Sequence, residues 1–253
     1  MADPSIKQEG YTERPELDYS QYGQYTSNLH LYEKRGSCLH PNTKAIYNTI
    51  KDYCRDFVVN HPQYPKFKWK PKIIDVCCGG GFGANILSQE GEFVWGIDKD
   101  ERSIKFAQDV FTRHRNNIYF TPELEFEVID VNTEDREIQA FDIVTCVNSI
   151  EHLANYENLI RFLKARCKKD KKGNYLEPPE ATKVFISTNN RNNYKTGKLE
   201  PRIPKHVREW TPDELYAILT SHFKYVTLMD IFGEPKELDM VDSLMLFKCE
   251  TPI

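Results

Sequence analysis

Apolar positions along the chain follow two periods, and the change from one to the other predicts the elements. Short apolar runs typical of buried strands occur at residues 72–78 (KIIDVCC), 93–98 (FVWGID), 125–130 (EFEVID), 141–147 (FDIVTCV) and 183–188 (KVFIST). Helical spacing predicts helices at 104–114, 153–169 and 211–223 between and after these strands. Two further strands are expected at 225–231 and 243–249, close to the end of the chain.

Repeated strand–helix units of this kind predict an α/β fold. We expect a Rossmann-like, doubly wound and mostly parallel seven-stranded sheet, whose last strand is antiparallel because only a short link precedes it. An amphipathic helix is expected after Pro41, and Pro62, Pro65 and Pro71 interrupt the chain beyond it. We therefore divide the chain into an extended or mobile arm (1–30), a helical cap and linker (31–70) and the main domain (71–253).

The composition excludes several classes of protein. A net charge of -4 and a pI near 6.0 give no basic excess, so nucleic acid is not favoured as a partner. No apolar run reaches 18 residues, which predicts the absence of a membrane span. The N-terminus lacks the apolar segment of a secretory signal. The seven cysteines form no CxxC pair, which predicts reduced thiols and a cytoplasmic location.

The strongest local signal is a glycine-rich turn after the first strand, IIDVCCGGGFGA at 73–84. Glycine lets the backbone turn tightly and approach a ligand, and in open α/β sheets ligands bind at the carboxyl ends of the strands. Asp98 ends the next strand, where a carboxylate can accept hydrogen bonds from the hydroxyls of a ribose. Gly79 and Gly81 also fit the loose G-x-G-x-x-G/A pattern with Ala84, so NAD is one candidate cofactor.

Asp75 favours a different cofactor. It lies inside the first strand, where dinucleotide-binding strands are apolar, and a buried carboxylate needs a hydrogen bond or a charge partner. A cationic part of a cofactor, or the loop amides that hold it, would meet that need. The alternative is that Asp75 only braces the glycine turn.

These segments together resemble class I S-adenosylmethionine-dependent methyltransferases over about residues 72–250. IIDVCCGGGFGA is similar to the first motif of that family, GID at 96–98 to the second, EVIDV at 127–131 to the third, FDIVTCVNSIEHL at 141–153 to the fourth, and KVFISTNN at 183–190 to a fifth-strand ending often written STPN. The resemblance implies S-adenosyl-L-methionine as cofactor. It also implies the cofactor-binding residues, which are Asp75, Cys77, Gly79, Gly81, Asp98, Lys99, Asp130, Val131 and Asn148. Cys77 departs from the family pattern, which has glycine there, so we expect a strained or tilted loop.

The segment after the fourth strand carries the candidate chemistry. Glu151 and His152 are placed at the ligand edge of the sheet, and the pattern resembles the E-x-x-E-H of ubiquinone-biosynthesis O-methyltransferases and small-RNA 2′-O-methyltransferases, which bind a divalent ion there. In this chain Asn148 replaces the first acid. His206, in HVREWTPDEL, is similar to a second histidine of the RNA enzymes. We take Glu151, His152 and His206 as catalytic candidates and assign no metal ligand. A bound Mg²⁺ and a purely structural role remain the alternatives.

The expected reaction is methyl transfer to an oxygen of a small molecule or glycan. Three alternatives are kept open: metal-dependent methylation of RNA, a non-catalytic partner protein that retains the fold, and a nicotinamide enzyme. The sequence does not fix the acceptor, because one fold hosts many functions.

Overall fold

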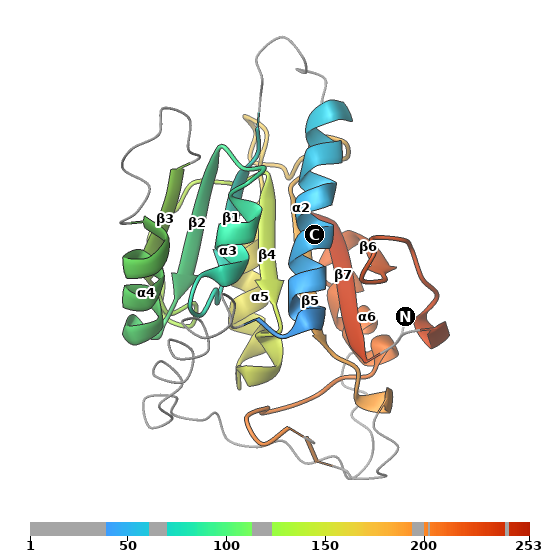
Figure 1. Ribbon diagram of the computed structural model, residues 1–253. Coiled ribbons are helices and arrows are strands. Elements are labelled where there is room, and N and C mark those ends of the chain that lie inside the picture. The colour runs from blue at the N-terminus through green and yellow to red at the C-terminus, as the bar shows by residue number, and fades with distance from the viewer. Residues whose placement is uncertain (1–38, 61–69, 113–122, 194–199, 202, 241–242) are drawn as a thin grey trace.

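The computed structural model describes residues 39–60, 70–112, 123–193, 200–201, 203–240 and 243–253. Its centre is a seven-stranded sheet with the strand order β3-β2-β1-β4-β5-β7-β6 (Figure 1). The strands are β1 Lys72–Val76, β2 Phe93–Asp98, β3 Glu123–Val128, β4 Ile143–Val147, β5 Lys183–Asn189, β6 Phe223–Met229 and β7 Leu244–Pro252. All adjacent pairs are parallel except the two that involve β7. The predicted doubly wound sheet with an antiparallel last strand is confirmed.

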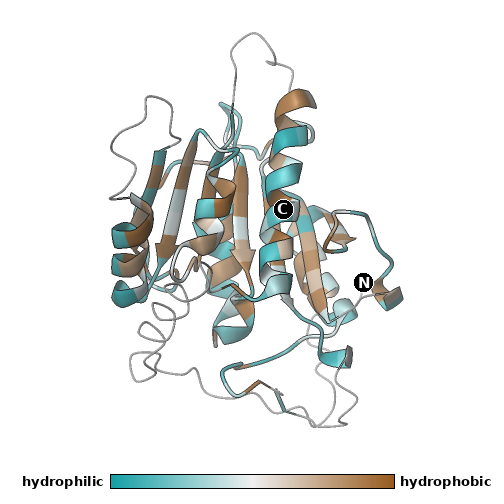
Figure 2. Ribbon diagram, in the orientation of Figure 1, coloured by the Kyte–Doolittle hydropathy of each residue, from teal (hydrophilic) through white to brown (hydrophobic). Residues whose placement is uncertain are grey.

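Helices cover both faces of the sheet, so the protein has three layers. The main helices are α2 Pro41–Asn60, α3 Phe82–Leu87, α4 Glu101–Ala107, α5 Tyr156–Ala165 and α6 Pro212–Thr220. Helices α2, α3 and α4 pack on one face and α5 and α6 on the other, each with its own cluster of buried apolar side chains. Figure 2 shows the strands as mostly hydrophobic, and the helices as hydrophobic on one side only.

Some boundaries differ from those predicted. The third strand was expected at 125–130 but begins at Glu123 and ends at Val128, because it pairs in register with β2 from Phe93 to Asp98. The helix expected from residue 104 already begins at Glu101, since Asp100 caps it by accepting a hydrogen bond from the Arg102 amide. After Ala107 the backbone continues as one π-helical turn, Gln108–Thr112.

Helix α2 is part of the core and not a separate layer. Ile46, Ile50 and Cys54 are fully buried, and Tyr47 is nearly so. Gly83 at the start of α3 makes room for the Tyr47 ring, because a Cβ atom on Gly83 would lie 2.0 Å from it. The predicted arm at 1–30 lies outside the described residues, and the division of the chain into arm, cap and main domain stays a prediction.

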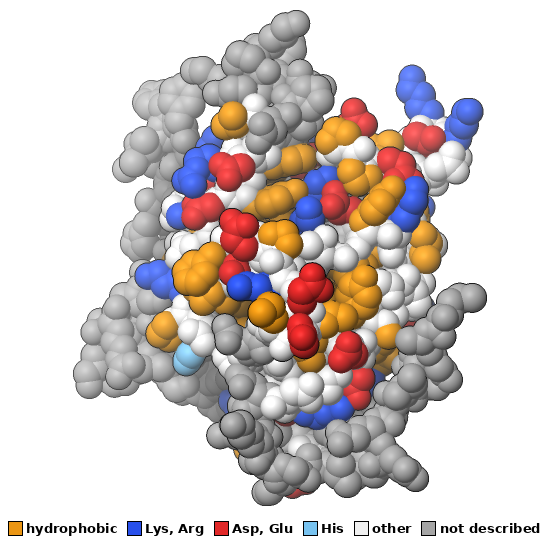
Figure 3. Space-filling model, turned by 90° about the vertical axis from the view of Figure 1, so that its right-hand side faces the viewer, with side chains coloured by type: hydrophobic (Ala, Val, Ile, Leu, Met, Phe, Trp, Pro, Cys, Tyr) orange, Lys and Arg blue, Asp and Glu red, His pale blue; other side chains and the backbone are white. Residues whose placement is uncertain are grey.

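The surface carries mixed charges. On the face in Figure 3, lysine and arginine side chains alternate with acidic and apolar ones, and no continuous basic area is visible among the residues described there. Within the described ranges, no helix has both the length and the apolar character needed to cross a membrane. The six cysteines in those ranges are free thiols.

Candidate active site

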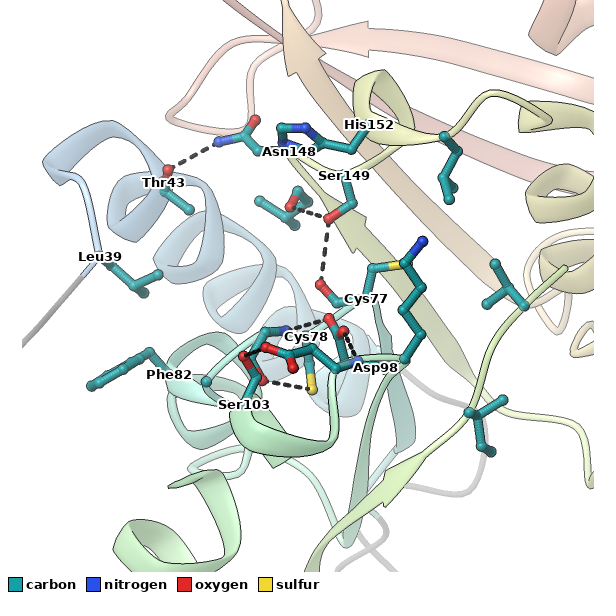
Figure 4. A pocket seen from close by; sticks show the side chains of 18 of the residues that line it. Leu39, Thr43, Cys77, Cys78, Phe82, Asp98, Ser103, Asn148, Ser149 and His152 are labelled. Atoms are coloured by element: carbon teal, nitrogen blue, oxygen red, sulfur yellow. Dashed lines mark hydrogen bonds between the residues drawn. The ribbon is translucent and has the colours of Figure 1, made fainter. Parts of the chain in front are cut away.

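A cavity of about 360 Å³ opens where the first four strands end (Figure 4). This is the edge where β1 and β4 lie side by side and the winding of the sheet reverses, which is the usual ligand crevice of such folds. Its volume is in the range of small-molecule sites. Seven of the nine predicted cofactor-binding residues line it: Cys77, Gly79, Asp98, Lys99, Asp130, Val131 and Asn148.

The glycine turn meets three different backbone requirements. Gly79 has φ +53°, and a Cβ atom there would meet nothing within 4 Å, so its backbone faces open space in the cavity wall. Gly81, at φ +77°, does not line the cavity, and a Cβ atom on it would lie 2.6 Å from the Phe126 ring. Cys77 adopts φ +59°, the left-handed region that costs an L-residue about 1–2 kcal/mol. The expected strain is therefore located at Cys77.

Asp98 joins the ends of two strands at the cavity wall. One carboxylate oxygen accepts a hydrogen bond from the Gly79 amide and the other from the Asp100 amide, both at 2.9 Å. Burial raises the pKa of Asp98, and these two hydrogen bonds act against that rise. Each carboxylate oxygen can accept a second hydrogen bond, so the group has capacity for a pair of ligand hydroxyls.

Beyond Asp98 the wall becomes apolar. Ile129, Val131 and Leu153 line the cavity there and are at most 5% exposed. Asp130 stands beside them, and one of its oxygens accepts a hydrogen bond from the Asn132 amide at 2.9 Å. An apolar wall with one polar group at its side suits a flat heteroaromatic ring.

Asp75 lies beneath the cavity and not in its wall. It is fully buried, and its carboxylate accepts hydrogen bonds from Tyr47 Oη at 3.1 and 3.2 Å and from Thr145 Oγ1 at 2.7 Å. Burial raises its pKa to about 7, and the two hydroxyls oppose that rise. Asp75 thus connects α2, β1 and β4 directly below the glycine turn, as in the bracing alternative.

Asn148, just after β4, forms the wall opposite Asp98. Its φ of +50° is tolerated by asparagine, and its amide group is held on both sides. Asn148 Nδ2 donates to Thr43 Oγ1 at 2.9 Å, and Asn148 Oδ1 accepts from Ser187 Oγ at 3.2 Å. The amide is therefore already engaged with protein groups.

Sequence reasoning missed the contribution of α2 to this site. Leu39, just before that helix, and Thr43 and Tyr47 within it line the cavity. Figure 4 shows Leu39 and Thr43 at its side. Thr43 and Tyr47 lie four residues apart in the helix, and this spacing is the signal that could have identified them, since residues at i and i+4 share a helix face. Lys205, from the segment before α6, was also missed.

The three catalytic candidates come together, but at different depths. Only His152 lines the cavity. Its Nδ1 lies 2.9 Å from the Lys205 carbonyl oxygen, which can only accept, so Nδ1 carries the proton and Nε2 is the basic nitrogen of the neutral ring. Glu151 and His206 are buried behind it, at 0% and 4% exposure. The His152 and His206 rings meet edge to face at 4.9 Å between centroids.

Glu151 is a buried carboxylate without a hydrogen-bond partner in the described part of the chain. His206 Nε2 approaches its Oε1 only to 4.0 Å, which is beyond hydrogen-bond distance. Burial raises the pKa of Glu151 to about 7, and the nearby His206 and, more weakly, the Thr188 hydroxyl oppose that rise. One donor atom from each of Glu151, His152 and His206 lies within 4.8 Å of the others, so this carboxylate and two imidazoles fit a divalent cation.

Comparison with known proteins identifies the family of the chain. Residues 47–228 match the model of a methyltransferase domain family, and the chain belongs to that family. The predicted resemblance to class I methyltransferases is confirmed, and so is the prediction that the protein is an enzyme.

Individual relatives are more distant. The ubiquinone biosynthesis O-methyltransferase of Idiomarina loihiensis is 30% identical over 142 residues, which are 56% of this chain and 51% of that protein. The chain thus spans about half the length of the curated relatives it matches.

Among solved structures, the plantazolicin methyltransferase BpumL in complex with SAH has a TM-score of 0.58 at 14% identity, with 92% of each chain covered. The magnesium protoporphyrin IX methyltransferase of Synechocystis, with bound SAH, has a TM-score of 0.54 at 15% identity, and the alignment covers 92% of this chain and 97% of that one. At such identities the likeness concerns the fold alone.

Proposed function

We propose that the protein uses S-adenosyl-L-methionine to methylate an oxygen atom of a small molecule or glycan. The observation that carries this proposal is the wall formed by Asp98 and Gly79. A carboxylate that already holds the glycine turn, at 2.9 Å from the Gly79 amide, lines a cavity with an apolar slot on one side and a histidine on the other. Asp98 would hold the ribose hydroxyls, and the slot at Ile129 and Val131 the adenine.

The methyl group would leave toward Asn148 and His152. Transfer from a sulfonium is an in-line displacement, so alignment of the acceptor is the main requirement, and a hydroxyl acceptor must also lose its proton. His152 suits that role because its Nδ1 proton is committed to the Lys205 carbonyl and Nε2 is left as the basic atom. Similarity to a ubiquinone biosynthesis O-methyltransferase supports oxygen as the acceptor atom.

Calorimetric titration with S-adenosylhomocysteine tests the cofactor. The wild type should bind it, and Asp98→Ala should bind at least about 100-fold more weakly, because the variant loses charged hydrogen bonds to two hydroxyls and the anchor of the turn. His152→Ala is the matched control from the opposite wall and should bind within about threefold of wild type. A wild type that binds NADH but not S-adenosylhomocysteine would overturn the proposal.

The acceptor role needs a separate measurement. A screen of phenols and sugars, read out by release of S-adenosylhomocysteine, identifies a substrate. With that substrate, His152→Ala should lower kcat by about 10²–10⁴-fold, the usual contribution of a general base. Loss of less than threefold would exclude His152 as the base.

A second candidate adds a divalent cation, and with it RNA as acceptor. The buried carboxylate of Glu151, which accepts no hydrogen bond from the described residues, favours a cation held by Glu151, His152 and His206. When bound, such an ion would lower the pKa of an acceptor hydroxyl. This candidate predicts activity that a strong chelator abolishes and RNA binding that weakens steeply with salt. Full activity in the chelator would remove it.

A further inference from the structure

The residues behind His152 are held by a segment distant in sequence. Residues 203–210 fold back onto the short turn Ile150–His152, and the Val207 amide donates to the Glu151 carbonyl oxygen at 2.9 Å. On the other side, His152 Nδ1 donates to the Lys205 carbonyl oxygen at 2.9 Å. These two contacts place His206 against both candidates.

Glu209 completes this cluster from below. It is 1% exposed, and its Oε1 accepts hydrogen bonds from His206 Nδ1 at 2.7 Å and from the Ile203 amide at 3.2 Å. Because an ionised carboxylate only accepts, the His206 proton must sit on Nδ1. The other nitrogen of the neutral ring, Nε2, then presents its lone pair on the side of Glu151, 4.0 Å from Oε1.

We propose that Glu209 is a positioning residue for a cation site. It selects the Nδ1-protonated form of His206 and so directs a bare Nε2 toward the carboxylate of Glu151. This inference rests on the second candidate function, in which Glu151, His152 and His206 hold a divalent ion. Carboxylates that accept the second proton of a metal-binding histidine act in this way, since they fix the tautomer and raise the basicity of the ligand nitrogen.

The geometry favours this reading over a plain ion pair. A protonated His206 donating to both carboxylates would be drawn to hydrogen-bond distance of each. The short contact is made only with Glu209, whereas the contact with Glu151 stays at 4.0 Å and the oxygens of Glu151 accept no hydrogen bond in the described chain. The spacing leaves an anionic oxygen and an imidazole facing each other across a gap that a cation can fill.

Binding of Mn²⁺ to the full chain, followed by electron paramagnetic resonance, tests the proposal without a methyl acceptor. Glu209→Ala should weaken Mn²⁺ binding by about 10–100-fold, as removal of such a partner does elsewhere. Glu209→Gln should stay within about threefold of wild type, because its amide oxygen can accept the same Nδ1 proton. Equal binding by wild type and Glu209→Ala would overturn the proposal.

Two further measurements separate this inference from the methyltransferase proposal. Titration with S-adenosylhomocysteine should give the same affinity in wild type and in both Glu209 variants, which also shows that they are folded. The ¹⁵N spectrum of metal-free wild type should show His206 protonated at Nδ1, and protonation at Nε2 would contradict the proposal. A wild type that binds S-adenosylhomocysteine but not Mn²⁺ would overturn the cation site alone.

Discussion

Two buried carboxylates lie beneath the two halves of the cavity, and only one of them has hydrogen-bond partners among the described residues. Asp75, below the glycine turn, and Glu151, below the histidines, are both fully buried, and burial raises the pKa of each to about 7. Asp75 accepts hydrogen bonds from the hydroxyls of Tyr47 and Thr145, whereas Glu151 accepts none from the described residues. Burial alone therefore does not distinguish a structural acid from a functional one.

The two carboxylates differ in whether the protein itself supplies their partners. The half that contains Asp75 is complete as it stands, because α2 and β4 supply the donors. The half that contains Glu151 needs a proton or a cation to neutralise its carboxylate, since a buried charge without a partner is costly. The half above Asp75 is therefore complete within the protein, whereas the half above Glu151 leaves a buried carboxylate without a hydrogen-bond partner among the described residues.

The largest expected effect is a loss of stability in the half that contains Asp75. Tyr47→Ala should lower the free energy of unfolding by about 3–5 kcal/mol, because it removes a large buried ring and one of the donors to Asp75. Tyr47→Phe keeps the ring and should cost only about 1–2 kcal/mol. Urea denaturation measures both. Similar losses for the two variants would mean that the hydroxyl, and not the ring, holds α2 in place.

The next effect concerns the pH dependence of the other half. Burial raises the pKa of Glu151 to about 7, above its unfolded value near 4.5. The contribution of its proton to stability is therefore full below pH 4.5 and is lost as the pH rises through 7. Relative to Glu151→Gln, the wild type should therefore lose on the order of 3 kcal/mol of stability between pH 4.5 and 8. Denaturation with chelator present measures this difference, in which the titration of Asp75 cancels. Parallel pH profiles for the two proteins would show that Glu151 is not buried as a charge.

The smallest expected effect compares the two left-handed residues, one in each half. Cys77→Gly should raise stability by up to about 1 kcal/mol, because glycine adopts a φ of +59° without strain. Asn148→Gly should instead lower it by about 1 kcal/mol, since the hydrogen bonds to Thr43 and Ser187 are lost. Thermal unfolding of the two variants measures whether stability rises in one and falls in the other. A loss of stability in both would show that the backbone at Cys77 is not strained.

The surroundings of the glycine turn are easier to predict from the sequence than those of His152. The glycine turn and Asp98 lie close together in the chain, and their positions at the edge of the sheet follow from strand ends that periodicity identifies. The doubly wound sheet and its antiparallel last strand were also predicted, whereas the strand order comes from the structure. The limits of the third strand were not predicted correctly, because they depend on its register with β2.

The surroundings of His152 and Asn148 depend on contacts between distant segments. His152 meets Lys205 across 53 residues, and Thr43 meets Asn148 across 105. No local pattern indicates that Glu151 lies behind the cavity and not in it. The sequence named side chains that the fold brings together there, but their depth and partners come from the tertiary fold.

The fit between Tyr47 and Gly83 has a consequence for how this protein can change. A methyl group at position 83 would occupy space that the aromatic ring already fills, since the two would lie 2.0 Å apart. Substitutions at the two positions should therefore be tolerated as pairs that conserve their combined volume, so that an alanine at 83 requires a smaller side chain at 47. The two positions thus behave as one unit under selection.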